Sequence, residues 1–250
     1  MKETSYFYSI ILIIVFGLIS SLLYSDQNSV VTARRIISEK FKIPAEKSVK
    51  IAFFDADSTL RVAPSGKPSA NSPDDVAILP MLAGPMRKLE QEGYLIAIVS
   101  NQAGVMYGHI TLEIARQALV KTINDLALKG VTIHYFDFAE NEDSDRKPET
   151  GMGDRLAGLV KEKLGCAIDW KNSIMVGDSG WKKGKDLEPD GTPGDDFSNT
   201  DRLFAENLNK KYGGVKFIHP RDFFGWIKLG IKNFKDFPSL KEFLETHPEK

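Results

Sequence analysis

Short apolar runs alternate with amphipathic stretches along most of this 250-residue chain. Strands are predicted where apolar runs are bounded by turn residues, at 51–54, 95–99, 131–138, 173–176 and 215–218. Helices are predicted from helical spacing of apolar residues and from Pro220, at 81–92, 111–128, 154–164, 201–208 and from 220 onward. Strands that alternate with helices predict an α/β fold, a doubly wound parallel sheet with helices on both faces. The Pro/Ser/Gly-rich segment 62–73 is expected to form an ordered loop or flap.

Polar residues stand at the carboxyl side of four predicted strands. Asp55 and Asp57 follow the first strand and Ser100 follows the second. Lys147 lies just beyond the third, and Asp178 follows the fourth. In a doubly wound sheet these ends line one crevice. Two carboxylates two positions apart point to one side of an extended chain, and they repel unless a cation or a shared proton lies between them. The pattern therefore indicates a hard-metal site with a nucleophile beside it.

Each of these residues also has an ordinary structural interpretation. The aspartates at 55 and 57, like Ser100 with Asn101, suit polar turns. Lys147 suits a solvated ion pair, because its loop is acidic. Asp178 after a glycine suits a helix cap. The functional interpretation rests on all of them occurring together, in order.

The first 25 residues differ from the rest of the chain. Residues 6–24 carry no charge and are long enough to span a bilayer as a helix, while their most apolar part is short and follows Lys2. We expect residues 1–25 to be either a cleaved signal peptide or a membrane anchor, which places the protein in the periplasm or cell envelope. Basic residues after this segment slightly favour a cytoplasmic domain, so the side of the membrane stays open. Residues 26–48 are interpreted as a linker.

Composition limits the classes of partner. The chain has 33 basic and 34 acidic residues, so a polyanion must be met by a local patch. The single cysteine, Cys166, excludes an internal disulfide and a zinc–cysteine cluster. It is interpreted as a small buried apolar residue.

The motifs at the strand ends resemble a known family. Four of them are similar to those of the haloacid dehalogenase superfamily of phosphatases: Asp-x-Asp-x-Thr at 55–59, Ser-Asn-Gln at 100–102, Arg-Lys-Pro at 146–148 and Gly-Asp at 177–178. The resemblance is closer to one branch, the 3′-phosphatase domain of polynucleotide kinase/phosphatase. The most distinctive piece is Asp-Phe-Ser-Asn-Thr-Asp-Arg-Leu-Phe-Ala-Glu-Asn-Leu at 196–208. The likeness covers about residues 49–226, and no Gly-x-x-x-x-Gly-Lys-Ser/Thr motif occurs in these 250 residues, so we expect this sequence to lack the kinase half.

The resemblance implies a role for each strand-end residue. Asp55 is the nucleophile that forms an aspartyl-phosphate, and Asp57 protonates the leaving alkoxide and then activates water. Ser100 and Lys147 hold the phosphoryl oxygens, where charge develops. Mg²⁺ is bound by Asp55, Asp178 and the backbone carbonyl of Asp57.

Three features depart from the family or stand at its margin. Ser58 occupies a position where the family usually has Gly, so the turn after the nucleophile carries an extra side chain. Residues 106–109 replace a segment that carries a basic residue in this branch, and a phosphate contact is lost there unless His109 substitutes. Asp201 is a weaker candidate, for the outer shell of the metal.

Insert lengths predict an uncovered site. Small-molecule members of the superfamily usually carry a cap domain, inserted after the first strand or before the Lys147 loop. These gaps hold about twenty and about eight residues, too few for a domain with its own core. Capless relatives that act on histidinol phosphate or heptose bisphosphate typically hold a Cys/His zinc loop, which one cysteine excludes here. An open crevice suits a phosphate at the end of a polymer.

Side chains near the crevice mouth are candidates for contacts with nucleic acid. Such contacts would go to backbone phosphate and would not read sequence. The candidates are Arg61, Lys67, Asn101, Lys182, Lys183, Lys185 and Arg202, with Trp181 as a base-stacking residue. The alternative for 182–185 is a solvated loop, offset by nearby aspartates.

Three functions fit the sequence. The first is a Mg²⁺-dependent phosphatase that removes 3′-phosphates from nucleic acid ends. The second is an envelope phosphatase of small phosphate esters or nucleotides, and the third is an inactive binding module with the same fold. We expect a monomer, a catalytic domain at 49–230 and a C-terminal helix or tail at 231–250, and we infer no protein partner from the sequence.

Overall fold

The computed structural model describes residues 41–232 and 234–236. The predicted signal or anchor at 6–24, most of the linker and most of the tail at 231–250 lie outside the described residues. Among the helices that are described, none combines the length and the apolar character needed to cross a membrane.

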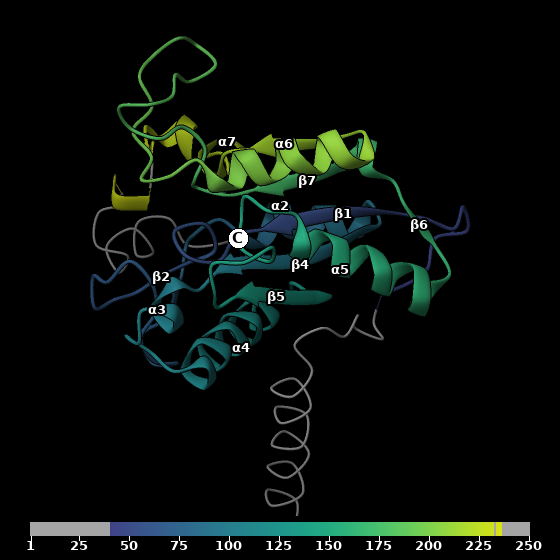
Figure 1. Cartoon of the computed structure of the whole chain (residues 1–250), viewed down its shortest axis with the longest axis horizontal. Helices are drawn as coiled ribbons and strands as arrows, with labels where there is room; N and C mark the ends of the chain where they lie inside the picture. Colours follow the sequence, from purple (N-terminus) through teal and green to yellow (C-terminus); the bar gives the residue numbers. More distant parts are fainter. Residues whose placement is uncertain (1–40, 233, 237–250) are drawn as a thin grey trace, which may run out of the picture. The chain divides into compact units, whose positions relative to one another are not determined.

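A parallel sheet forms the centre of the domain (Figure 1). Its main strands are β1 (Ser48–Phe54), β4 (Tyr94–Asn101), β5 (Tyr135–Ala139), β7 (Ser173–Val176) and β8 (Val215–Ile218). Their order is β5-β4-β1-β7-β8, and β6 (Ala167–Ile168) pairs with the start of β1. The chain moves outward from β1 through β4 to β5 and then returns to build the other half, so the order reverses beside β1. The doubly wound prediction is confirmed.

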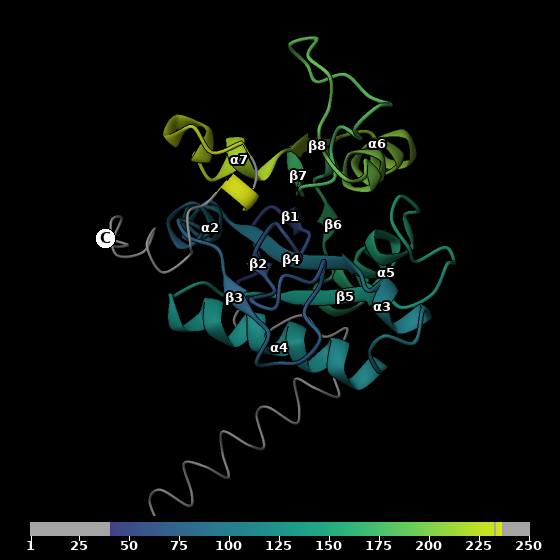
Figure 2. The same ribbon diagram turned by 90° about the vertical axis from the view of Figure 1, so that its left-hand side faces the viewer.

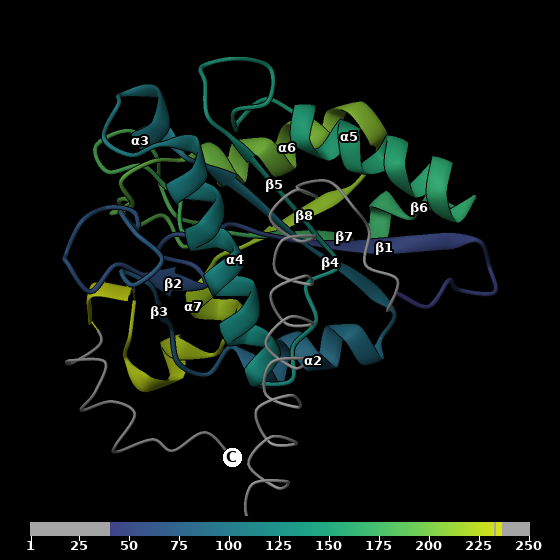
Figure 3. The ribbon, with the colours of Figure 1, turned by 90° about the horizontal axis from the view of Figure 1, so that it is seen from below.

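Helices cover both faces of the sheet, as Figures 2 and 3 show. On one side lie α5 (Gly151–Leu159), its π-helical continuation η1 (Val160–Leu164) and α6 (Thr200–Tyr212). On the other lie α2 (Ala83–Gln91), α4 (Leu112–Leu128) and α7 (Pro220–Phe223). Alternate residues of β1 serve the two cores, because strand side chains point to opposite faces. Phe53 packs edge-on against Phe204 of α6, while Phe54 packs against Phe223 of α7.

Most predicted elements are present with shifted bounds. Thr111 caps α4 as expected, since its hydroxyl accepts a hydrogen bond from the Ile114 amide at 3.2 Å. The third strand starts at Tyr135 and not at 131, and just before it His134 Nδ1 accepts a hydrogen bond from the Ile96 amide of β4 at 3.0 Å. The helix predicted at 154–164 starts at Gly151, and Gly165 ends its π-helical last turn at φ 62°.

Several short elements were not predicted. The flap after β1 contains a two-stranded antiparallel ribbon, β2 (Arg61–Val62) with β3 (Ala77–Ile78). Asp75 orders the flap loop by accepting hydrogen bonds from the Ser65 amide and hydroxyl at 2.8 and 2.7 Å. The remaining pieces are α3 (Ala103–Met106) and the 3-10 turns η2 (Trp170–Asn172), η3 (Trp226–Leu229) and η4 (Phe234–Asp236).

Candidate functional site

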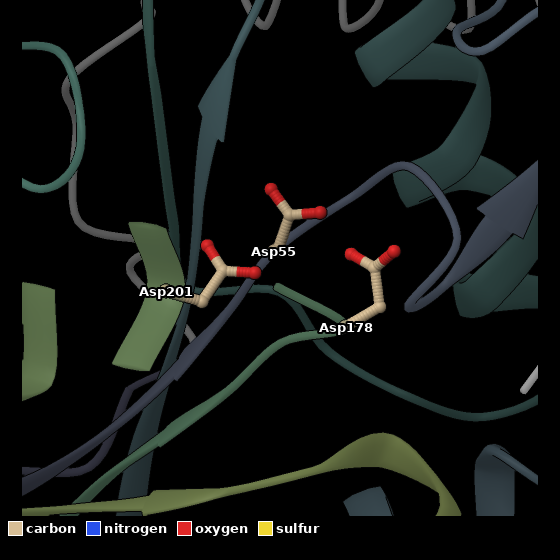
Figure 4. A group of neighbouring side chains, drawn as sticks. All are labelled: Asp55, Asp178 and Asp201. Atoms are coloured by element: carbon tan, nitrogen blue, oxygen red, sulfur yellow. The ribbon is translucent and has the colours of Figure 1, made fainter. Parts of the chain in front are cut away.

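Three carboxylates converge at the carboxyl ends of the central strands. Asp55 follows β1, Asp178 follows β7, and Asp201 lies in the first turn of α6. Each offers an oxygen, and these oxygens lie within 4.8 Å of one another (Figure 4). Asp55 and Asp201 are buried, while Asp178 is partly exposed. Asp55 and Asp178, which the sequence predicted as metal ligands, are therefore brought together. Asp201, which the sequence placed only in an outer shell, joins them.

Hydrogen bonds from the backbone amides hold all three aspartates in place; that of Asp201 goes to the Ser179 carbonyl at 3.1 Å. The Asp55 amide donates to the Val176 carbonyl at 2.9 Å, which extends the β1–β7 pairing by one residue. The Asp178 amide donates to the Thr59 hydroxyl at 3.0 Å. Gly177 is required between β7 and Asp178, because a Cβ there would overlap the Asp201 carboxylate. The cluster is therefore built by the fold and not by flexible side chains.

Lys147 supplies a buried positive charge to the cluster. Its Nζ lies 2.6 Å from Asp55 Oδ1 and 2.7 Å from Asp201 Oδ1, and it donates to the Val99 carbonyl at 2.9 Å. The side chain is only 1% exposed. Lys147 thus contacts the nucleophile candidate directly.

Asn101 holds the Lys147 backbone. The Asn101 side-chain Oδ1 accepts from the Lys147 amide, and its Nδ2 donates to the Lys147 carbonyl, each at 2.9 Å. Both ends of the side-chain amide are therefore used within the protein. These bonds position the lysine, and the prediction that Asn101 contacts substrate stays a prediction.

Burial and mutual repulsion shift the titration of the cluster. Burial, together with the Asp201 and Asp57 carboxylates, raises the pKa of Asp55 to about 7 against the opposing effect of Lys147. Burial, followed by Asp55 and Asp201, raises the pKa of Asp178 well above its ordinary value. Burial alone would lower the pKa of Lys147, but Asp201 and Asp55 outweigh it and raise that pKa. A divalent cation bound between these carboxylates would offset their repulsion and favour their ionised forms.

The donor set fits Mg²⁺. Three carboxylates face one ammonium group, and oxygen-only ligands are what this small, hard ion prefers. Asp55, Asp178 and Asp201 are the side chains that would hold it. The Asp57 side chain is not part of this group. That the Asp57 backbone carbonyl binds the metal stays a prediction.

Replacing Asp178 with Asn should stabilise the metal-free protein. The raised pKa means that the folded state resists ionising Asp178, so its penalty on folding appears above pH 3.8 and grows as pH rises. Without divalent ions, the Tm of Asp178→Asn should exceed that of wild type, with a difference that widens as the pH rises above about 4. Mg²⁺ should raise the Tm of wild type, and it should raise that of this variant by less. Asp222→Asn, on a carboxylate 51% exposed, is the matched control and should show neither effect.

Asp57 lies beside the cluster and is held by two neighbours. Arg61 Nε and Nη2 donate to its two carboxylate oxygens at 2.9 and 3.3 Å. Gln102 Nε2 donates to Asp57 Oδ2 at 2.8 Å and to Ser100 Oγ at 2.9 Å. Ser100 therefore lies at the site, where the sequence placed it, and is buried.

Two predicted substrate contacts are not supported. Arg61 has no exposed surface, because the turn after Asp57 directs its side chain inward to α4, so the prediction of a substrate contact is wrong. Arg202 donates to the Gly180 carbonyl at 2.8 Å and pairs with Asp186 and Glu206, so its guanidinium is used within the loop and helix. Lys182 keeps an exposed side chain, as a phosphate contact requires.

The turn after the nucleophile candidate is strained. Ser58 has a φ of 67°, a left-handed conformation that costs a non-glycine residue about 1–2 kcal/mol. The turn is closed by hydrogen bonds from the Ser58 amide to the Arg61 carbonyl at 2.7 Å and from the Leu60 amide to the Ala56 carbonyl at 2.9 Å. This explains why glycine is usual here in the family that the sequence resembles.

Ser58→Gly should therefore stabilise the protein. Relief of the strain, less the extra backbone entropy that glycine loses on folding, predicts a gain of about 0.5–1 kcal/mol in the free energy of unfolding. Urea denaturation measures it. Ser72→Gly, at a position without a left-handed backbone, should instead lose stability, and a loss at both positions would contradict the assignment of strain to Ser58.

Asp201 is the site residue that sequence reasoning underrated. It lies in the distinctive motif at 196–208, which begins with Asp196, a loop anchor whose Oδ2 accepts from the Gly180 and Trp181 amides at 2.9 and 2.7 Å. The Ser179 amide donates to Asp201 Oδ2 at 3.1 Å. An acidic residue in the first turn of a helix also fits a favourable interaction with the helix dipole, so the motif alone did not separate that role from a metal ligand.

Comparisons with known proteins agree with this geometry. A family model described as "Polynucleotide kinase 3 phosphatase" matches residues 50–224. An uncharacterized 20.8 kDa protein of Autographa californica nuclear polyhedrosis virus is 34% identical over 166 residues, covering 66% of this chain and 83% of the viral protein. A probable D-glycero-D-manno-heptose-1,7-bisphosphate 7-phosphatase of Thermoplasma volcanium is 29% identical over 135 residues, covering 52% of this chain and 86% of that protein.

A putative bifunctional polynucleotide phosphatase/kinase of Acanthamoeba polyphaga mimivirus is 29% identical over 200 residues. The match covers 76% of this chain and 44% of the mimivirus protein. The region matched by the family model begins in β1 and ends just after α7, so it contains the whole carboxylate cluster and Lys147.

Proposed function

The chain belongs to the polynucleotide kinase 3 phosphatase family, within the haloacid dehalogenase superfamily of phosphatases, and from this premise we propose a specific reaction for it. The protein is a phosphatase. The proposal is that it removes 3′-phosphates from polynucleotide ends, with Mg²⁺ as cofactor and an aspartyl-phosphate intermediate on Asp55.

The arrangement of side chains supports this chemistry. Asp55 attacks phosphorus, and Asp57 gives a proton to the leaving alkoxide and later takes one from water. Lys147, 2.6 Å from the nucleophile, and Ser100 hold the phosphoryl oxygens where charge develops. A Mg²⁺ ion bound by Asp55, Asp178 and Asp201 would supply further neutralisation of that charge.

The observation that best supports a polynucleotide as substrate is the small size of the segments inserted after β1 and before Lys147. The described residues belong to a single compact unit, and the flap after β1 is a two-stranded ribbon with a loop and not a folded domain. The loop before Lys147 is short and tied to α5, since Asp145 pairs with Arg155. An end of a long chain can approach a site without a cap.

A small phosphate ester is the second candidate, because heptose bisphosphate phosphatases are among the relatives. The sequence argument against it is the single cysteine. Cys166 is buried, and its thiol donates to the Leu164 carbonyl, so it is placed as a core residue and not as a zinc ligand.

A phosphate-release panel with Mg²⁺ tests the proposal. A 3′-phosphorylated oligonucleotide should exceed the matching mononucleotide 3′-phosphate in kcat/KM, because contacts remote from the reacting group lower the barrier. A 5′-phosphorylated oligonucleotide and heptose bisphosphate should be poor substrates. Equal or better hydrolysis of the mononucleotide would refute the polynucleotide substrate, and preference for the sugar phosphate would favour the second candidate.

The remaining expectations stay proposals. Contacts to nucleic acid would be made with backbone phosphate, with Lys182 as the exposed candidate, and would not depend on base sequence. A monomer, and export or membrane tethering through residues 6–24, are proposed from the sequence alone.

A further inference from the structure

Arg61 is a charged side chain with no exposed surface. Its Nε and Nη2 reach the two oxygens of Asp57, and its Nη1 donates to the Thr122 hydroxyl at 3.0 Å. Thr122 lies on α4, and its hydroxyl donates its own proton to the Ala118 carbonyl at 2.9 Å. The Thr122 oxygen is therefore oriented to accept from Arg61, and the guanidinium is fixed at both ends.

Gln102 completes the enclosure of Asp57. Its Nε2 donates to Asp57 Oδ2, which also receives Arg61 Nη2, whereas Oδ1 receives Arg61 Nε alone. A carboxylate oxygen has two acceptor sites, so Oδ1 retains one while Oδ2 has both used. The two oxygens are thus unequal.

We propose that Arg61 and Gln102, anchored by Thr122, are positioning residues that hold the Asp57 carboxylate with Oδ1 as its proton-carrying atom. A bidentate pair fixes both the place and the rotation of a carboxylate, and proton transfer depends on that geometry. The inference rests on the proposed acid–base role of Asp57 and adds three residues to it.

Asp57 gives up a proton in the first step and regains one in the second, so the cycle balances. In the first, an Asp55 oxygen bonds to phosphorus, the bond from phosphorus to the leaving oxygen breaks, and the proton on Asp57 Oδ1 moves to that oxygen. In the second, a water oxygen bonds to phosphorus, its proton moves to Asp57 Oδ1, and the bond to Asp55 breaks.

Leaving groups of different basicity test the clamp that Arg61, Gln102 and Thr122 form around Asp57. Arg61→Met should lower kcat/KM for a 3′-phosphorylated oligonucleotide by about 100-fold or more, the usual contribution of a placed general acid. For p-nitrophenyl phosphate, whose phenolate leaves without a proton, the loss should stay below about five-fold. The same variant should show a burst of nitrophenolate, because water attack on the aspartyl-phosphate still needs Asp57.

Thr122→Val keeps the side-chain shape and removes the hydroxyl, which accepts from Arg61 and donates to the Ala118 carbonyl of the same helix. It should show the same selective loss, about 3–10-fold, consistent with one hydrogen bond. Arg116→Met, on the same helix but paired with Glu113, is the matched control and should leave kcat/KM for both substrates unchanged. Equal losses on both substrates in Thr122→Val, or no loss on either, would overturn the proposal even where Arg61→Met does not fold.

2-Glycerol phosphate, a second ester with an alkoxide leaving group, separates this inference from the proposed substrate. If wild type hydrolyses it but not the oligonucleotide, the polynucleotide substrate is refuted. The clamp is then judged on 2-glycerol phosphate against p-nitrophenyl phosphate by the same criteria.

Discussion

Asp55→Asn is expected to abolish phosphate release while leaving the fold intact. The amide cannot form an acyl phosphate, so kcat should fall by about 10⁴-fold or more, as for other enzymes that lose their nucleophile. Lys147 keeps Asp201 as a partner at 2.7 Å, and the variant loses a carboxylate whose pKa is raised to about 7. The free energy of unfolding at pH 8 should therefore match or exceed that of wild type.

Two measurements check this prediction. Steady-state phosphate release gives the loss in kcat, and acid quenching with labelled substrate should trap label on wild type but not on Asp55→Asn. Asp222→Asn makes the same chemical change on an exposed carboxylate and should keep full activity. Turnover near the wild-type level in Asp55→Asn would remove Asp55 from the nucleophile role.

Lys147→Met is expected to give the largest loss of stability. Lys147 is the cation that contacts both Asp55 and Asp201, and removing one partner of a buried pair leaves uncompensated charge, at a cost of about 3–5 kcal/mol. Methionine fills similar space, so the loss is electrostatic and not a cavity effect. Urea denaturation at pH 8 without divalent ions measures it, and Mg²⁺ should restore part of the stability by replacing the missing charge.

A second substitution tests the cause. Asp201→Asn in the Lys147→Met background removes one of the repelling carboxylates and should recover part of the lost stability. Lys183→Met, on a lysine 78% exposed and paired with Asp195, should leave the free energy of unfolding nearly unchanged. A loss in Lys147→Met no larger than in Lys183→Met would show that the central charges are solvated.

The sequence by itself determined the sheet and the strand ends. Buried strands are recognised clearly because their apolar runs are short and bounded by turns, and the rule that parallel strands end at one edge placed Asp55, Asp178 and Lys147 together. The backbone alone places these residues at the site, so their positions in the sequence were sufficient to predict that they lie together.

Only the tertiary structure decided the direction of side chains that leave a turn. Ser58, with its left-handed φ of 67°, reverses the chain so that Arg61 returns to Asp57 and points inward, whereas its place near the site had suggested contact with substrate. Asp201 became a member of the carboxylate cluster because α6 packs against the end of β7, a contact between segments distant in sequence. Local patterns fix which face of a strand or helix is apolar. They do not fix where a polar side chain finds its partner, since that partner comes from another element and exists only once the elements have packed.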